Sequence, residues 1–264
     1  MKKITIIGGD NRLKSLKKGL EKEGFFVDSL GLFEDDNAKV ETSDIVIFPI
    51  PTTKDKKTVF CPLTSRKIEL SEIAKRIDAR TLILSCNYIF ENKNNIDFGS
   101  LDSYALLNAV PTAEGAIKLA IENTDFTLWK AKILVIGFGR VGKILADRLK
   151  ALGAEVTVSA RKQRDFAQIS ALGFDYIDTN SLNRESLEFD IIFNTVDVKV
   201  INDDKLKEAK CDLMIDLSTF GGFSLTVAEK NGIKAIKAPA LPLKTAPKTA
   251  SEILFKTVMQ IINS

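Results

Sequence analysis

The residues best placed to do chemistry lie in one segment, which runs from Val135 to Lys162. It reads VIGFGRVGKILADRLKALGAEVTVSARK, in which an apolar strand leads into three glycines spaced GxGxxG and then into an amphipathic helix. In such a turn the first glycine permits tight bending, the second admits a pyrophosphate, and the third lets the helix pack closely. The helix start supplies N–H donors to the phosphates. We therefore expect cofactor contacts from Gly137, Gly139, Arg140, Val141 and Gly142, the alternative being a purely structural turn.

The next strand ends in residues that bear on which dinucleotide is bound. NAD-binding proteins usually place an acidic residue there, which accepts hydrogen bonds from the ribose 2′-hydroxyl and would repel a 2′-phosphate. Here the strand ends in Ser159 and Ala160, and Arg161 and Lys162 follow, and we expect all four residues to contact the cofactor. Because these cations can donate charge-assisted hydrogen bonds to a phosphate, we predict a preference for NADP, with NAD also possible.

Composition excludes several other kinds of chemistry. The 264 residues contain no histidine, which rules out Ser-His-Asp triads, Cys-His pairs and histidine-ligated metals. Three widely spaced cysteines lack metal-ligand spacing and are typical of reduced thiols in the cytoplasm, so we expect no metal. The net charge is +3 with both signs dispersed, and no apolar run is long enough to span a bilayer. We expect neither nucleic acid nor membrane as a partner.

Strands alternate with helical patterns along the whole chain, which predicts an α/β protein with parallel sheets. We expect two doubly wound domains with the active site in the cleft between them. Residues 1–110 would form an N-terminal substrate domain, on which a C-terminal helix at 249–264 packs back, and residues 111–248 a Rossmann domain. The expected elements are apolar runs at 3–9, 25–32, 44–51, 81–85 and 104–110, helices at 12–24 and 71–77, and second-domain strands at 132–139, 155–159, 190–195, 213–218 and 233–239.

Several motifs together resemble the A-subunit family of dipicolinate synthase. They are IGGDNR (7–12), NAVPTAEGAIKLAIENTDFTL (108–128), the glycine segment, FNTV (193–196), IDLSTFGG (215–222) and KAPALPLKTAPKTA (237–250). The resemblance implies oxidation of a ring derived from 4-hydroxy-tetrahydrodipicolinate in a sporulating mother cell, with nicotinamide as acceptor and an oligomer that includes the flavoprotein-like B subunit. It also implies a layout related to 2-hydroxyacid dehydrogenases. Ala240, Leu243 and Ser251 stand where we expect family glycines, and Asp197 where we expect proline.

The implied substrate is a small dicarboxylate, so its site needs donors at the carboxyl ends of strands. In the first domain these are Thr52, Thr53 and Asn87, for which turn capping is the alternative. A helix opened by Pro111, with Thr112 as its cap, would add Asn108, Thr112 and the acid/base candidate Glu114.

The second domain and the loop that follows it contribute further candidates. Arg140 could bridge cofactor and substrate, and Lys248 could neutralise a carboxylate or move a proton, although a solvated lysine is equally plausible there. The residues expected to bind cofactor are Asn194, Thr195, Val196 and Asp216, and those expected to bind substrate are Ser218 and Lys244.

Two other functions remain open at this point. One is a non-catalytic protein that senses NADP and regulates a partner, for which an apolar surface patch would be expected. The other is a different NADP-dependent dehydrogenase, for example of the shikimate type, although its Lys and Asp motifs are not found.

Overall fold

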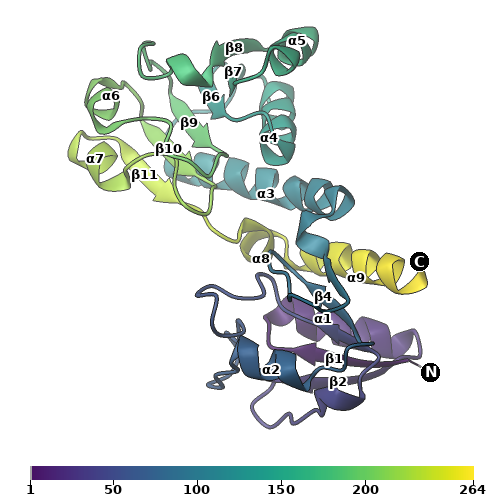
Figure 1. The fold of residues 1–264 in the computed structure, drawn as a ribbon. Helices are drawn as coiled ribbons and strands as arrows, with labels where there is room; N and C mark the ends of the chain where they lie inside the picture. The colour runs from purple at the N-terminus through teal and green to yellow at the C-terminus, as the bar shows by residue number, and fades with distance from the viewer. Residues whose placement is uncertain (1) are drawn as a thin grey trace. The chain divides into compact units, whose positions relative to one another are not determined.

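The computed structural model describes residues 2–264, and it divides into two compact units (Figure 1). Residues 2–108 and 247–264 form the first unit, and Ala109–Ala246 the second. Each unit is a parallel sheet covered by helices on both faces, as expected from the alternation of strands and helices. Within residues 2–264, no helix combines the length and apolar character that a membrane crossing requires.

The first unit contains a five-stranded sheet in the order β2-β1-β3-β4-β5. Its strands are β1 (Lys3–Ile7), β2 (Phe26–Leu30), β3 (Ile45–Ile47), β4 (Leu82–Ser85) and β5 (Asn95–Asp97), and its helices include α1 (Asn11–Lys22), α2 (Leu70–Arg76) and α9 (Pro247–Asn263). The strand order changes direction between β1 and β3, where ligands of doubly wound sheets bind. The fifth strand has little apolar character, which is why the sequence pattern did not indicate it.

Successive side chains of β3 point to opposite faces of this sheet, and each face has its own helices. Ile45 and Ile47 pack with α1 and with α9, while Val46 packs with α2. Figure 1 shows α1 and α9 side by side, so the last segment of the chain completes the core built by the first segment. Gly24, with a φ of +88°, follows α1 in the left-handed conformation that commonly ends a helix.

The second unit contains a six-stranded sheet in the order β11-β10-β9-β6-β7-β8. Its strands are β6 (Lys132–Ile136), β7 (Glu155–Ala160), β8 (Asp175–Asp178), β9 (Ile191–Asn194), β10 (Leu213–Asp216) and β11 (Lys234–Lys237). Counted within the unit, this is the order 6-5-4-1-2-3 of the Rossmann fold. The predicted fold class is therefore confirmed.

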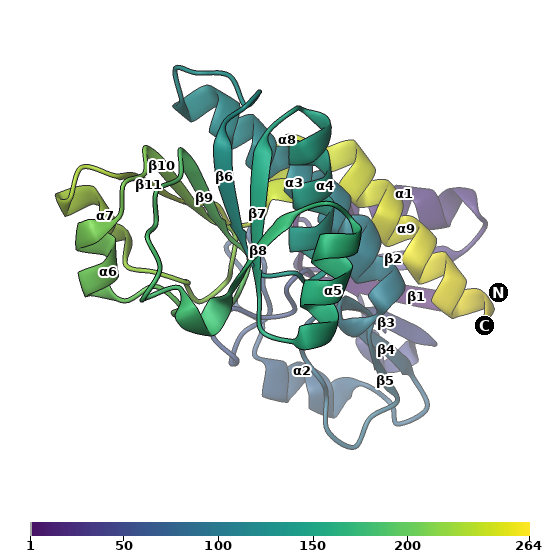
Figure 2. The same cartoon turned by 90° about the horizontal axis from the view of Figure 1, so that it is seen from above.

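Helices cover both faces of this sheet. They are α4 (Arg140–Ala151), α5 (Gln163–Ala171), α6 (Asp203–Glu208), α7 (Leu225–Lys230) and α8 (Leu241–Thr245). Ile133 and Val135 pack with α4 and α5, whereas Leu134 and Ile136 pack with α6 and α7. Figure 2 shows α6 and α7 on the opposite side of the sheet from α4 and α5.

The helix expected to begin at Pro111 is in fact part of a longer one, α3 (Asp102–Asn123). Pro111 lies inside it and cannot donate to the carbonyl of Leu107, a loss that normally ends a helix. However, four small residues, Ala109, Ala113, Ala116 and Ala120, form a continuous buried stripe along α3. Packing along that stripe keeps the helix intact through the proline, so the apolar run at 104–110 is helical and Thr112 does not cap a helix.

Candidate functional site

The glycine turn after β6 has the geometry needed to bind a dinucleotide. Gly137 has a φ of +100°, and a Cβ there would lie 2.6 Å from Thr195 Oγ1. At Gly142 a Cβ would lie 2.0 Å from the Gly137 carbonyl oxygen, so α4 could not pack against the turn. Around Gly139, by contrast, a Cβ would meet no atom within 4 Å. The first and third glycines are thus required by the fold, whereas the second leaves space for a phosphate.

The start of α4 provides the donors for that phosphate. Gly139 caps the helix without a side chain, and the first turn holds no acidic residue. The first N–H groups of a helix have no partner within it, and the dipole makes that end positive. Arg140 is exposed at the first position and Val141 is half-buried beside it. These residues fit the pyrophosphate contacts predicted for them.

Three cations follow β7, and their charged side chains have no hydrogen-bonding or ion-pairing partner among the described residues. Arg161, Lys162 and Arg164 are all exposed, in the loop and first turn that lead into α5. The two residues before them are buried, because Ser159 shares a hydrogen bond of 3.0 Å with Thr179 and Ala160 is 5% exposed. A contact between the Ser159 hydroxyl and the cofactor is therefore not supported.

Four strands end level with one another at the edge where a dinucleotide would cross the sheet. In the strand register Ile136 pairs with Asn194, Asn194 with Asp216, and Asp216 with Lys237. Neighbouring strands lie about 4.8 Å apart, so this row extends about 14 Å from β6 to β11. The switch in strand order falls between β6 and β9, with the cations after β7 on one side and Lys237 on the other.

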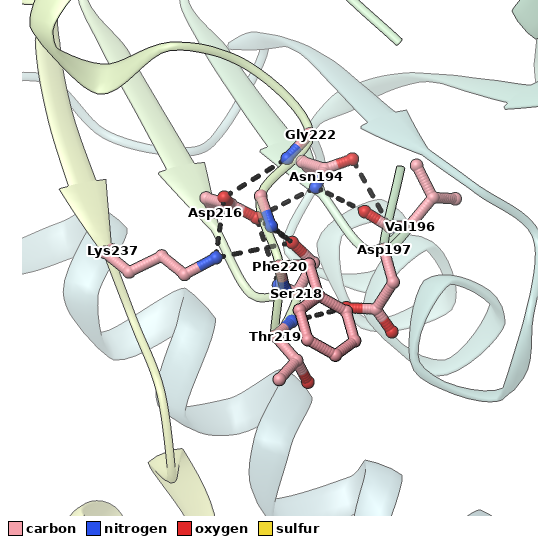
Figure 3. A network of polar contacts seen from close by, with 10 residues as sticks. Asn194, Val196, Asp197, Asp216, Ser218, Thr219, Phe220, Gly222 and Lys237 are labelled. Atoms are coloured by element: carbon pink, nitrogen blue, oxygen red, sulfur yellow. Dashed lines mark hydrogen bonds and ion pairs between the residues drawn. The ribbon is translucent and has the colours of Figure 1, made fainter. Parts of the chain in front are cut away.

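The polar residues of this row form an internal network, shown in Figure 3. Asp216 is buried and accepts five hydrogen bonds: from the Asn194 amide, the Ser218 N–H and the Ser218 hydroxyl on Oδ1, and from the Gly222 N–H and Lys237 Nζ on Oδ2. The second N–H of Asn194 donates to the Val196 carbonyl.

These bonds occupy the polar groups that were expected to touch ligands. A carboxylate offers about four lone-pair sites, so Asp216 has no capacity left for a ribose hydroxyl. The only protons of the Ser218 hydroxyl and of the Asn194 amide are donated inside the network. The structure therefore corrects the roles predicted for Asn194, Asp216 and Ser218, which shape the site from within. Thr195 and Val196 lie half-buried against Gly137 and still border the turn.

Opposing effects act on the Asp216 carboxyl. Burial would raise its pKa, but hydrogen bonds from Ser218, Asn194 and Lys237 outweigh it and hold the pKa below the ordinary value of 3.8. Asp216 is therefore ionised at neutral pH. The sequence analysis missed Lys237, although its place at the end of a strand was a signal that could have found it.

A short loop after β10 is held rigidly by the same network and by a second carboxylate. Asp197, which stands where we expected proline, accepts hydrogen bonds from the N–H groups of Thr219 and Phe220. The Ser218 hydroxyl accepts from the N–H of Gly221 at 3.0 Å. Phe220 at the tip is 85% exposed. The departure at Asp197 therefore supplies a loop anchor that proline, which has no carboxylate, could not provide.

Of the three substrate candidates in the first unit, one is structural. Thr52 is fully buried; its hydroxyl accepts from the Cys86 N–H at 2.9 Å and so ties the loop after β3 to the end of β4. Thr53 Oγ1 donates to Asp55 and accepts from the Lys56 N–H, a turn-capping role. Asn87 is exposed with a φ of +58° and is the most available of the three.

A buried ion pair at the switch point of the first sheet was not foreseen. Asp10 caps α1 and binds Arg12 with two hydrogen bonds, at 3.0 and 2.7 Å. Arg12 also donates to the Ile50 carbonyl after β3 at 3.0 Å. Burial would lower the pKa of Arg12, but Asp10 outweighs it and raises the pKa. The guanidinium is therefore always charged and joins the two loops at which a ligand of this sheet would bind.

A pocket of about 290 Å³ in the first unit is lined by loop residues that include Lys54, Cys61 and Lys67. Burial, aided by the charge of Asp36, raises the pKa of Cys61 to about 11. Because the thiol stays protonated at neutral pH, Cys61 is a poor nucleophile. Three cations, Lys54, Arg66 and Lys67, outnumber the single carboxylate of Asp55 in the lining of this pocket, so the lining carries a net positive charge.

The remaining candidates lie on α3, α8 and α9, and they differ in burial and in hydrogen-bonding or ion-pairing partners. Asn108 and Thr112 lie inside α3 rather than at a helix start, and both are half-buried. Glu114 lies 3.4 Å from Arg148, eight residues and thus about 12 Å along α4 from the glycine turn. The structure shows an ion pair for Glu114, and its part in proton transfer stays a prediction. Lys244 in α8 and Lys248 at the start of α9 are exposed.

Comparisons with known proteins match both units. Residues 3–89 match the family described as the N-terminal domain of the dipicolinate synthase A-subunit, and residues 113–220 the NAD binding domain of D-isomer specific 2-hydroxyacid dehydrogenases. The chain is 30% identical to the dipicolinate synthase A-subunit of Bacillus subtilis, over 98% of this chain and 95% of the relative.

Solved structures agree with these matches. The crystal structure of the dipicolinate synthase A-subunit from Bacillus halodurans has a TM-score of 0.88 and 29% identity, and the match covers 100% of this chain and 98% of that one. The apo-structure of D-lactate dehydrogenase from Escherichia coli has a TM-score of 0.63 at 14% identity, covering 99% of this chain and 96% of that chain. The second likeness concerns the fold alone.

Proposed function

The chain belongs to the A-subunit family of dipicolinate synthase, and from that premise we propose that it is the NADP-linked dehydrogenase component of that enzyme. The family resemblance seen in the sequence is thereby confirmed, and the NAD-binding domain supports a dehydrogenase. Preference for NADP, the identity of the substrate and the partner belong to the proposal.

The observation that carries the cofactor preference is the group of unpartnered cations after β7. Arg161, Lys162 and Arg164 are exposed beside the turn, and the strand itself ends in Ser159 and Ala160 rather than in an acid. A guanidinium can bind a 2′-phosphate through charge-assisted hydrogen bonds, and no carboxylate at the strand end opposes it. This arrangement supports NADP over NAD.

The proposed reaction converts 4-hydroxy-tetrahydrodipicolinate to pyridine-2,6-dicarboxylate. The ring loses one water, and one hydride and one proton then leave it; the nicotinamide of the bound cofactor supplies the hydride acceptor, and the proton goes to solvent. Formation of the aromatic ring makes the overall change favourable. The chain therefore has to hold a dianion in place more than it has to supply a strong base.

We assign substrate contacts to residues that stay accessible or charged. In the first unit these are Asn87 and the Arg12 guanidinium, and Lys244 and Lys248 remain proposed counter-charges for a carboxylate. Thr53, whose hydroxyl caps a turn, is not among them. Arg140, Thr195 and Val196 remain proposed cofactor contacts. We further propose a complex with the B subunit, higher oligomers, and a place in the cytoplasm of a sporulating mother cell.

The test is turnover by the purified chain together with the B subunit. Freshly generated hydroxy-tetrahydrodipicolinate is supplied with NADP⁺ or NAD⁺, and formation of dipicolinate and of reduced nicotinamide is followed. We expect kcat/KM to be about 10- to 100-fold higher with NADP⁺, the value of one charge-assisted hydrogen bond. Arg161→Asp should reverse this preference, because it replaces a donor by a charge that repels phosphate.

Lys132→Asp is the matched control, since it makes the same change of charge at the other end of a neighbouring strand. It should leave the cofactor preference unchanged. If the reconstituted pair forms no dipicolinate with either cofactor, the proposed reaction is wrong. If Arg161→Asp and Lys132→Asp behave alike, the reaction can stand but the assignment of Arg161 is wrong.

A further inference from the structure

Lys237, the last residue of β11, has a place and a set of contacts that the cofactor site does not use. Its Nζ lies 2.9 Å from Asp216 Oδ2 and 3.4 Å from Ser218 Oγ (Figure 3). The side chain is 29% exposed, whereas that of Asp216 is 1% exposed. An ammonium group has three N–H donors, and these two contacts occupy two of them. A third donor is left on a cation that reaches solvent.

The ion pair with Asp216 fixes the side chain of Lys237. Three of the five hydrogen bonds to Asp216 fall on Oδ1, from Asn194 and from the N–H and hydroxyl of Ser218, so Oδ2 accepts only from the Gly222 N–H and from Lys237. The buried anion and the Ser218 hydroxyl thus hold an otherwise flexible side chain in place. A cation fixed in this way loses little conformational entropy when it binds an anion.

The strand order places Lys237 near the nicotinamide end of a dinucleotide bound across this sheet. The adenosine end is assigned to the cations after β7, and the dinucleotide crosses the sheet between β6 and β9. The nicotinamide end then lies over β9 and β10. Lys237 pairs in register with Asp216, and Asp216 pairs with Asn194 on the next strand. The Cα atoms of Lys237 and Asn194 are therefore about 10 Å apart. A side chain of lysine length can reach a substrate placed against the nicotinamide.

We propose that the Lys237 ammonium, fixed by Asp216, binds one carboxylate of the dicarboxylate substrate. This inference rests on the proposed function and adds to it the residue of the second unit that recognises the substrate. Lys237 contacts substrate, and Asp216 acts as a positioning residue through it. Because the same carboxylate persists in the product, the site also binds pyridine-2,6-dicarboxylate.

The test measures product binding and turnover separately. The full chain with saturating NADP⁺ is titrated with dipicolinate by calorimetry, and NADPH binding is measured by fluorescence. Lys237→Met should weaken dipicolinate binding about 10- to 100-fold, the value of one charge-assisted hydrogen bond, and leave NADPH binding unchanged. With the B subunit, KM for the substrate should rise by a similar factor while kcat changes less. Lys237→Arg should recover much of the loss, because it restores the charge.

The control is Lys234→Met, three residues earlier on β11 and about 10 Å away along the strand. It removes an ammonium group whose one hydrogen bond within residues 2–264 is to the Asn123 carbonyl. It should bind dipicolinate as the unaltered chain does. Wild-type dipicolinate affinity in Lys237→Met would overturn the inference, and so would equal losses of NADPH and dipicolinate binding, which indicate a structural role. If the unaltered chain neither binds dipicolinate nor forms it, the proposed function fails as well.

Discussion

Two alanine substitutions in the glycine turn should separate stability from cofactor binding. Gly139→Ala places a methyl group where no atom lies within 4 Å, on a residue whose φ of −80° any amino acid adopts. Gly142→Ala places one 2.0 Å from the Gly137 carbonyl oxygen and 3.3 Å from Thr195 Oγ1. The methyl group of Gly139→Ala is thus harmless to the fold, whereas that of Gly142→Ala requires α4 to move.

The magnitudes follow from these spaces. Gly142→Ala should lower the free energy of unfolding by about 1–3 kcal/mol, as overpacking of a close contact usually does. Gly139→Ala should leave it about unchanged, because the gain of about 0.4–1 kcal/mol from the fewer unfolded conformations of alanine is offset by the poorer N-cap preference of alanine. Both should weaken NADPH binding at least tenfold, which is about 1.4 kcal/mol: the first displaces the helix that binds the phosphate, and the second blocks the approach of the phosphate itself.

Thermal unfolding followed by circular dichroism, together with NADPH titrations, would measure both effects. The informative variant is Gly139→Ala, which should melt like the unaltered chain yet bind NADPH poorly. Normal NADPH affinity in this variant would refute our reasoning, because the phosphate could not then lie against the turn. Normal stability of Gly142→Ala would show that the packing of α4 on the turn is not as described.

Two further predictions concern the second unit. The folded-state pKa of Asp216 is below its ordinary value, so its contribution to stability is present above about pH 4 and is lost as the pH falls through the folded-state value. Asp216→Asn should therefore unfold more easily at pH 7, by about 3 kcal/mol, with a smaller difference at about pH 3; a constant difference across this range would contradict it. Ala240 has a φ of +58°, a conformation that suits glycine, so Ala240→Gly should leave Tm unchanged or raise it by about 2–4 °C. Ala250→Gly, inside α9, should lower Tm, and equal losses in both variants would argue against strain at Ala240.

Position 240 also shows what a departure from a family pattern can reveal. The sequence led us to expect glycine there, and the structure holds alanine in the left-handed conformation that glycine tolerates best. The backbone of this loop thus keeps a glycine-like shape although the residue has changed. At Asp197, where we expected proline, the change supplies hydrogen bonds that anchor the loop carrying Phe220.

The sequence alone determined the α/β architecture, the Rossmann unit and its phosphate-binding turn. Each of these depends on a local pattern: alternating apolar runs, a glycine spacing, or cations directly after a strand. The steric need of Gly142 is set five residues away by the carbonyl of Gly137, whereas that of Gly137 comes from its positive φ and from Thr195 at the end of a distant strand. The glycine spacing therefore indicates the turn, but the fold supplies part of the reason for it. Binding of a dinucleotide followed from these local patterns, whereas the dehydrogenase activity followed from the resemblance to the A-subunit family.

Only the tertiary structure decided which polar residues face a ligand and which serve the fold. Thr52, Ser159, Asn194 and Ser218 have the residue types of a binding site, yet each is buried against a partner distant in the sequence or locked in the Asp216 network. The tertiary structure also decided the length of α3. This helix continues through Pro111 because packing of a buried alanine stripe outweighs the helix-breaking effect of proline. Hydrogen-bond partners come from neighbouring strands, and strand order is not written in any single segment.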